Sequence, residues 1–224
     1  MASTIAFDVY GTLIDTNGVV EKLTESIGEL APAFANTWRD KQLEYSFRRG
    51  LMQRYEHFGI CTQQALDYTC LFYQIEMTTA QKQALLDIYK ALPAFDDVTD
   101  ALEQLKLNGH QLYAFSNGNQ EAVKGLLKAA NIEQYFLGVV SVDDVKTFKP
   151  NPSVYSHFLQ KTESKKDDAW LISSNPFDVI GALSHGMQAA WIKRSDKAIF
   201  DPWGLEPMVT INSLMELNTA MMSN

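Results

Sequence analysis

Near the start of the chain stands the stretch S-T-I-A-F-D-V-Y-G-T-L, residues 3–13, from which the fold can be worked out. Its first part, residues 3–8, is a short apolar run rich in residues that favour β-structure, and Gly11 follows almost at once. Short apolar runs bounded by turn residues are typical of buried strands. The stretch therefore predicts a buried strand that ends at Asp8 in a tight loop.

Beyond residue 93 the sequence alternates between helical and strand-like patterns. Apolar residues recur at helical spacing, or proline marks a helix start, in segments 97–108, 120–130, the stretch opened by Pro152, and 177–184. Short runs typical of strands lie at 111–115, 138–142, 170–173, 188–192 and 209–211. Such alternation implies a parallel sheet covered by helices on both faces. We therefore expect an α/β fold with a Rossmann-like doubly wound parallel sheet as its core.

A stretch of different character separates the first strand from this alternating part. Within residues 15–93 glycine is sparse, runs of β-formers are absent, and apolar residues recur at helical spacing, as at Leu43, Phe47, Leu51 and Tyr55. We expect a helical cap domain over 15–93, inserted into a core domain made of 1–14 and 94–224.

Composition and charge argue against several classes of protein. The net charge is −8 and no basic run occurs, so neither a nucleic-acid partner nor an anionic membrane is expected. No apolar stretch approaches the ~20 residues of a membrane span. The N-terminus lacks the basic region of a signal peptide. Cys61 and Cys70 are too few for a disulfide framework, so reduced thiols and a cytoplasmic location are the expectation.

The predicted strands all deliver polar side chains to one edge of the sheet. These are Asp8 after the first strand, Ser116 and Asn117 after the second, Lys149 after the third, and Ser173, Asn175 and Asp178 at the fourth. Each alone has a structural explanation as a turn residue, a helix cap or a solvated charge. Ligands of such sheets bind outside the carboxyl ends of the strands, so the convergence favours a functional site.

The chemistry that these groups permit is specific. A carboxylate on a sharp turn after a strand, as Asp8 is, can act as a nucleophile. Lys149 nearby would keep it ionised. Asp178 would either anchor that lysine or activate a water. Ser116, Asn117 and loop amides would cradle an anionic group of the substrate.

Four motifs, in their order along the chain, resemble those of the haloacid dehalogenase superfamily. They are F-D-V-Y-G-T-L at 7–13, F-S-N-G at 115–118, K-P-N-P at 149–152 and S-S-N-P-F-D at 173–178. The segment W-R-D-K-Q-L-E-Y at 38–45 is similar to a cap helix of the (S)-2-haloacid dehalogenases within that superfamily. The resemblance spans nearly the whole chain.

This resemblance implies roles for individual residues. The catalytic positions that it marks are Asp8 as the nucleophile, Arg39 as the cap arginine linked to halide capture, and Thr12, Lys149, Tyr155, Ser173, Asn175 and Asp178. The substrate-binding positions are Val9, Tyr10, Arg39, Ser116, Asn117 and Phe177. It further implies a homodimer formed through the cap. Pro176 and Phe177 stand where the family usually has alanine and tryptophan, which affects the shape of this loop and of the pocket beside it.

The residue at position 10 decides between two reactions. Phosphatases of this superfamily carry a second aspartate two residues after the nucleophile, which protonates the leaving group. Here that position is Tyr10. A halide leaves without a proton, so Tyr10 suits dehalogenation. We expect conversion of short (S)-2-haloacids to (R)-2-hydroxy acids through an aspartyl ester, with no metal and no cofactor. A magnesium-dependent small-molecule phosphatase, with Asp178 as a metal ligand, is the alternative; a binding protein on the same fold would have lost Asp8 or Lys149.

Overall fold

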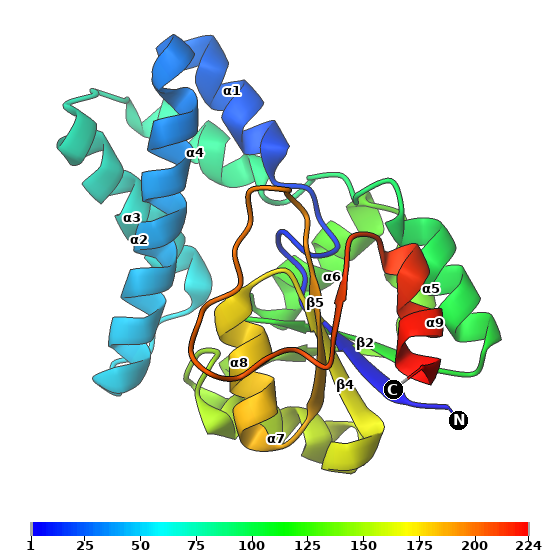
Figure 1. Ribbon diagram of the computed structural model, residues 1–224. Helices are drawn as coiled ribbons and strands as arrows, with labels where there is room; N and C mark the ends of the chain where they lie inside the picture. Colours follow the sequence, from blue (N-terminus) through cyan, green and yellow to red (C-terminus); the bar gives the residue numbers. More distant parts are fainter. Residues whose placement is uncertain (1, 224) are drawn as a thin grey trace.

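The computed structural model describes residues 2–223, and a six-stranded sheet forms its centre (Figure 1). The strands are β1 Thr4–Phe7, β2 Gln111–Ser116, β3 Gly138–Ser141, β4 Ala169–Ser173, β5 Gln188–Ile192 and β6 Val209–Ile211. Their order is β3-β2-β1-β4-β5-β6, and every neighbouring pair is parallel. The chain moves outward from β1 in both directions, so the predicted doubly wound α/β fold is confirmed.

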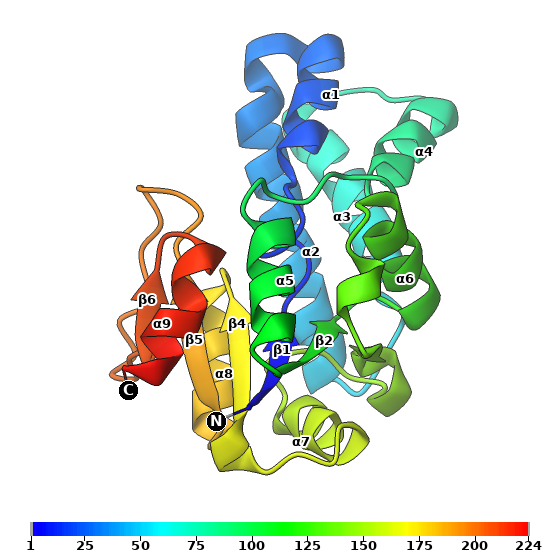
Figure 2. The same ribbon diagram turned by 90° about the vertical axis from the view of Figure 1, so that its right-hand side faces the viewer.

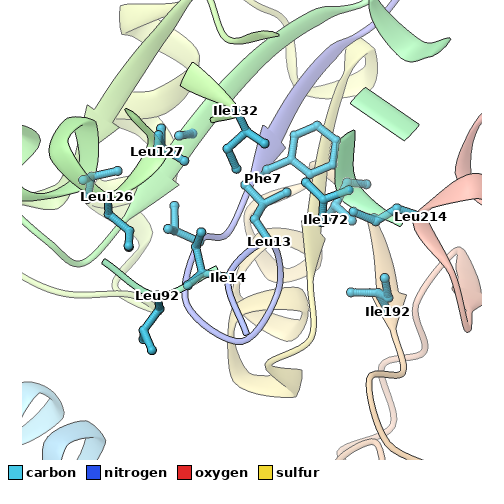
Figure 3. Close-up of a cluster of buried hydrophobic side chains, with 14 of the residues drawn as sticks. Phe7, Leu13, Ile14, Leu92, Leu126, Leu127, Ile132, Ile172, Ile192 and Leu214 are labelled. Atoms are coloured by element: carbon cyan, nitrogen blue, oxygen red, sulfur yellow. The ribbon is translucent and has the colours of Figure 1, made fainter. Parts of the chain in front are cut away.

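Helices cover both faces of this sheet (Figure 2). One face carries α5 Val98–Leu107, α6 Gln120–Ala129 and α9 Leu217–Met222; the other carries α7 Pro152–Lys161 and α8 Pro176–His185. Side chains alternate along β1, so Phe7 joins the core on the first face and Ala6 joins the core on the second. Figure 3 shows Phe7 and Ile172 from the sheet beside Leu13, with Leu126 and Leu127 of α6 farther along the same cluster. The predicted helices and strands of this part are confirmed, with ends shifted by a residue or two.

Four further helices lie together beyond the carboxyl ends of the strands (Figure 1). They are α1 Asn17–Ile27, α2 Ala31–Leu51, α3 Phe58–Tyr73 and α4 Thr79–Ile88. The segment that leads from the sheet to these helices and the segment that leads back lie side by side. Asp15 N donates to Pro93 O at 2.9 Å, and Phe95 N donates to Leu13 O at 3.0 Å. We propose from this paired crossing that the helices form a cap domain over 15–93.

The helical spacing of apolar residues expected in the cap does not hold at Leu51 and Tyr55. Leu51 is 85% exposed, and Tyr55 lies beyond the helix, where its hydroxyl donates to Asp143 Oδ1 at 2.6 Å. Spacing predicts one face only while a helix continues, and α2 ends at Leu51 before the left-handed residue Gln53 (φ 54°). Cys61 and Cys70 are free thiols buried in α3, as expected. Within residues 2–223, no helix is both long and apolar enough to span a bilayer.

Candidate active site

The position of Asp8 follows from the central place of β1 in the sheet. Its backbone N–H donates to Ile172 O at 2.9 Å, which extends the pairing with β4 by one residue. The chain then turns sharply, because the N–H groups of Leu13 and Ile14 both donate to Val9 O. Gly11 takes a left-handed φ of 77° in this turn, a conformation that favours glycine. The Asp8 side chain is thereby fixed at the carboxyl end of the sheet.

The two carboxylate oxygens of Asp8 have unequal surroundings. Oδ2 accepts from Thr12 Oγ1 at 3.0 Å, Ser173 Oγ at 3.2 Å and Asn175 Nδ2 at 2.8 Å. Oδ1 accepts from Lys149 Nζ at 3.2 Å, and within residues 2–223 no other donor reaches it. One oxygen is therefore held by three neutral donors, and the other faces a single cation.

Lys149 is buried, with 1% of its surface exposed. Its ammonium donates to Asp178 Oδ2 at 2.7 Å, to Asp8 Oδ1 and to Phe115 O at 2.8 Å. Burial acts to lower the pKa of Lys149, but attraction by Asp178 and Asp8 outweighs it and the pKa is raised. Lys149 is therefore a charged group placed between two carboxylates.

Asp178 is fully buried in the first turn of α8 and has both oxygens engaged. Oδ2 accepts from Lys149, and Oδ1 accepts from the Tyr155 hydroxyl at 2.8 Å. Burial raises the pKa of Asp178, against the opposing attraction of Lys149. Burial and the charge of Asp178 likewise raise the pKa of Tyr155, so this phenol stays a neutral donor. Of the two roles considered for Asp178, the contacts favour anchoring the lysine over activating a water.

Asn175 links the nucleophile to the cap. It lies at the N-cap position of α8, yet its side chain makes no capping bond. Its Nδ2 donates to Asp8, and its Oδ1 accepts from Arg39 Nη2 at 3.3 Å. Asn119, by contrast, does cap α6 by accepting from Ala122 N at 2.8 Å. Pro176 occupies the start of α8, where proline fits, so the unusual residue leaves this helix intact.

Arg39 is held in place by its neighbour on α2. Trp38 is fully buried, and its Nε1 donates to Thr62 O of α3 at 2.9 Å. The Trp38 ring also meets the Tyr89 ring edge-on, with centroids 5.5 Å apart. These contacts fix the helix face that points Arg39 toward Asn175, so the cap contributes a cation beside the nucleophile.

Two small cavities flank this arginine, and both are lined by Tyr10, Arg39 and Tyr89. The first, about 200 Å³, reaches Asn175; the second, about 220 Å³, reaches Phe58. Such volumes lie below the range of drug-sized ligand pockets and suit a molecule of few heavy atoms. Burial, and then repulsion by Tyr89, raises the pKa of Tyr10 to about 12 despite Arg39, so Tyr10 is a poor proton donor.

The structure brings eight predicted residues into one connected group: Asp8, Thr12, Arg39, Lys149, Tyr155, Ser173, Asn175 and Asp178. Val9 and Phe177 are placed elsewhere. The Val9 side chain is fully buried in the core, and Phe177 meets Phe47 of the cap edge-on, with centroids 5.2 Å apart. Neither lines the two cavities. Any contact of Val9 with substrate is therefore limited to its backbone.

Ser116 and Asn117 have local partners. Ser116 Oγ accepts from Gly118 N at 3.0 Å, and Asn117 Oδ1 accepts from Lys149 N at 3.0 Å. The Ser116 hydroxyl keeps its proton free to donate, because this bond uses only an acceptor position. Asn117 also positions the loop that carries the lysine. Their predicted roles in substrate binding stay predictions.

Tyr89, Gln42 and Phe58 line the second cavity and were not identified from the sequence. Gln42 is 1% exposed and its Nε2 donates to the Tyr89 hydroxyl at 3.2 Å. Helical periodicity marks such residues only as cap residues, since it does not say how the cap sits on the core. The segment W-R-D-K-Q-L-E-Y was a usable signal for Gln42, because it placed Arg39 in the site and Gln42 lies one turn later.

Comparison with known proteins matches residues 2–186 to the haloacid dehalogenase-like hydrolases. The chain is 37% identical to (S)-2-haloacid dehalogenase 1 of Pseudomonas sp. (strain CBS-3), over 85% of this chain and 84% of that protein. It also resembles a solved dehalogenase with an intermediate complex (TM-score 0.92, 32% identity, 96% and 95% of the two chains). The structure of L-2-haloacid dehalogenase from Xanthobacter autotrophicus with chloropropionic acid covalently bound is similar too (TM-score 0.89, 26% identity, 99% of each chain).

This chain therefore belongs to the haloacid dehalogenase-like hydrolases, and the family expected from the motifs is confirmed. Relatives that match most of this chain include several named (S)-2-haloacid dehalogenase and one named haloacetate dehalogenase H-2, from Moraxella sp. (strain B).

Proposed function

We propose that this protein is an (S)-2-haloacid dehalogenase that converts short (S)-2-haloacids to (R)-2-hydroxy acids through an ester on Asp8. The observation that carries the proposal is the difference between the two oxygens of Asp8. Oδ2 is held by three hydrogen-bond donors, and Oδ1 contacts Lys149. Three donors occupy Oδ2, whereas Oδ1 accepts one bond of 3.2 Å and keeps lone-pair density free to attack carbon, so Oδ1 is the better nucleophile.

In the first step Oδ1 attacks C2 of the substrate from the face opposite the halogen. The carbon–halogen bond breaks, the halide takes its electron pair, and C2 inverts. Lys149 keeps the carboxylate ionised, and Arg39 lies on the cap where it can stabilise the departing halide. Ser116 and the loop after Asp8 hold the substrate carboxylate. Alignment of nucleophile and substrate in this way accounts for much of the rate gain in such sites.

In the second step water attacks the carboxyl carbon of the ester. Oδ2 is now the ester carbonyl oxygen, and it becomes an oxyanion as the tetrahedral intermediate forms. Thr12, Ser173 and Asn175 already point donors at this oxygen, which is the arrangement of an oxyanion hole. The intermediate then collapses: Oδ1 leaves as the C2 oxygen of the 2-hydroxy acid and takes one proton of the attacking water, and the oxygen of that water remains on Asp8. One proton is released over the whole reaction.

The phosphatase alternative has less support. Tyr10 stands where a phosphatase needs an acid, and a phenol with a pKa of about 12 transfers a proton poorly at neutral pH. Asp178 has both oxygens bound by Lys149 and Tyr155, so it offers no free oxygen to a metal ion. Within residues 2–223 no three acidic, histidine or cysteine side chains are grouped as metal ligands would be. Independence from metal and cofactor is part of the proposal.

The proposal includes a homodimer formed through the cap and a cytoplasmic location. Exposed apolar side chains support the first: Leu71 and Phe72 at the end of α3 are 79% and 61% exposed. The free thiols of Cys61 and Cys70 fit a reducing compartment. Sedimentation equilibrium tests the dimer, since a monomer at micromolar concentration contradicts it.

Two assays run side by side test the proposed reaction. We expect halide release from (S)-2-chloropropionate and almost none from the (R) isomer, with (R)-lactate as the product. An aryl phosphate supplied with magnesium should release no phosphate above background. Phosphate release without halide release would replace this proposal with the phosphatase.

A further inference from the structure

We propose that Arg194 is a positioning residue for the reaction: it fixes the backbone of Thr12 so that the Thr12 hydroxyl stays aimed at Asp8. Arg194 lies two residues after the end of β5, and it lies on no motif that marked the site. Its Nε and Nη2 both donate to Thr12 O, at 3.1 and 2.7 Å. The planar guanidinium thus donates two hydrogen bonds to one carbonyl oxygen, and the single ammonium of a lysine lacks this geometry. The inference rests on the proposed function and deepens it.

The guanidinium is itself fixed on its other side. Its Nη1 donates to both carboxylate oxygens of Asp97, each at 2.8 Å. Asp97 also accepts from Ser213 Oγ at 2.9 Å and from Leu214 N at 2.8 Å. The Phe95 ring lies 4.2 Å from the guanidinium carbon. The end of β5, the start of α5 and the segment after β6 therefore converge on a single carbonyl of the nucleophile loop.

Thr12 transmits this constraint to the reacting atoms. Its hydroxyl donates to Asp8 Oδ2 at 3.0 Å and accepts from Ser174 N at 2.9 Å. The same hydroxyl lies 3.2 Å from Ser174 Oγ, and Thr12 is fully buried. Arg194 grips the carbonyl of the same residue, so a shift of that carbonyl moves the hydroxyl away from Oδ2. The donor lost would be one of the three that stabilise the oxyanion of the second step.

If Arg194 only stabilised the fold, its substitution would have a different kinetic effect from the one that positioning of Thr12 predicts. Removal of one partner from a largely buried ion pair destabilises the fold, but that effect alone would change the amount of folded enzyme and not the rate of one chemical step. Arg194 lines neither cavity beside the site, so its loss should spare substrate binding. The inference therefore predicts a loss located in ester hydrolysis: kcat falls, KM falls with it, and kcat/KM, which reports the attack by Asp8, changes little.

The experiment compares Arg194→Ala and Arg194→Lys with the wild-type enzyme and with Arg49→Ala. Arg49 is a matched control, because its guanidinium also grips a backbone carbonyl, that of Arg54, but in the cap and away from Asp8. For both Arg194 variants we expect kcat to fall ~10–100-fold, as for a displaced catalytic donor, with KM falling alongside it so that kcat/KM changes less than ~3-fold. Arg49→Ala should keep the wild-type kcat.

Two further readouts separate positioning from folding. Rapid quench followed by mass spectrometry measures the fraction of enzyme that carries the Asp8 ester at steady state. This fraction should be larger in the Arg194 variants than in the wild type, because hydrolysis slows more than attack. Methylguanidinium added to Arg194→Ala should restore part of kcat, whereas methylammonium should not. If Arg194→Ala folds poorly, the amount of Asp8 ester in Arg194→Lys decides.

Two sets of results overturn the inference. Wild-type kcat in both variants does so, and so does a loss of activity that follows the folded fraction alone with no extra ester and no rescue. A wild-type enzyme that releases no halide from any 2-haloacid instead defeats the proposed function, and the inference falls with it.

Discussion

Arg39 of the cap donates to Asn175 of the core across 3.3 Å, and this bond joins the two layers at the nucleophile. The amide nitrogen of the same Asn175 donates to Asp8 Oδ2 at 2.8 Å. The cap cation therefore reaches the nucleophile through one residue, and it does so only while the cap lies on the core. Opening of the cap to admit substrate would take Arg39 away from the site.

Arg39→Lys should lose halide release as completely as Arg39→Ala. The planar guanidinium can contact Asn175 and the halide together, whereas an ammonium is a single point of charge. We expect both variants to lower kcat/KM for (S)-2-chloropropionate by at least ~10²-fold. Arg48→Lys is the control, since Arg48 lies on the same helix with 63% of its side chain exposed. Near-normal turnover in Arg39→Ala would remove Arg39 from the site.

Gly181→Ala should damage the site although Gly181 touches no substrate. A Cβ at Gly181 would lie 2.7 Å from Pro150 Cβ and closer still to the Tyr155 hydroxyl, which donates to Asp178. We expect a loss of ~1–3 kcal/mol in unfolding free energy and a fall in kcat. In the matched variant Gly125→Ala, a Cβ within helix α6 meets nothing within 4 Å. That variant should gain ~0.4–1 kcal/mol and keep full activity. Equal denaturation midpoints for the two variants would contradict the packing.

Sequence reasoning succeeded where a pattern is local. The strand 3–8, the turn at Gly11 and the helix opened by Pro152 depend on neighbouring residues, and the structure has all three. Convergence of strand ends followed from the parallel sheet, so Asp8 and Lys149 were correctly placed together. Capping logic alone did not decide Asn175, whose side chain turns from its helix to Asp8.

What sequence reasoning missed depends on contacts between distant segments. Tyr89 lines both cavities because the end of α4 returns to the site, and no spacing reveals that return. The ring of Phe177 packs against Phe47, a contact that depends on how the cap sits on the core, and the predicted contact of Phe177 with substrate stays a prediction. Arg194 reaches Thr12 across 182 positions of sequence, outside every motif.

The acid limb of activity should lie above the ordinary range of an aspartate. Burial raises the pKa of Asp178, and only its ionised form holds Lys149 in place. As pH falls through this raised pKa, Asp178 gains a proton and kcat should drop. The free energy of unfolding should depend on pH in the opposite direction. A carboxyl whose pKa is higher in the folded than in the unfolded protein stabilises the fold fully below the unfolded pKa of ~3.9. This stabilisation is lost as pH rises through the folded pKa.

Measurement of kcat and of the free energy of unfolding as functions of pH tests whether the two change in opposite directions as pH falls. In Asp178→Asn the stability contribution described for Asp178 should vanish from the pH profile. A wild-type kcat that stays flat down to pH ~4 would place the titration of Asp178 in its ordinary range and contradict the account.

Removal of metal ions should leave the reaction unchanged. Lys149 supplies the positive charge between Asp8 and Asp178, and a halide needs no Lewis acid to leave. Enzyme treated with a chelator and then dialysed should release halide from (S)-2-chloropropionate at the untreated rate. A strict requirement for added magnesium would favour the phosphatase reading of the site.

The measurement that tests the central claim most directly follows oxygen through one turnover. Asp8 as a nucleophile and Asp8 as a base for water both invert C2, so stereochemistry does not separate them. A single turnover in heavy-oxygen water, with enzyme in excess, should label the peptide that contains Asp8 and leave the hydroxy acid largely unlabelled, since Oδ1 is the oxygen transferred. Asp8→Asn should lose nearly all activity. Label in the product of that first turnover, with none in the Asp8 peptide, would make Asp8 a base and contradict the account.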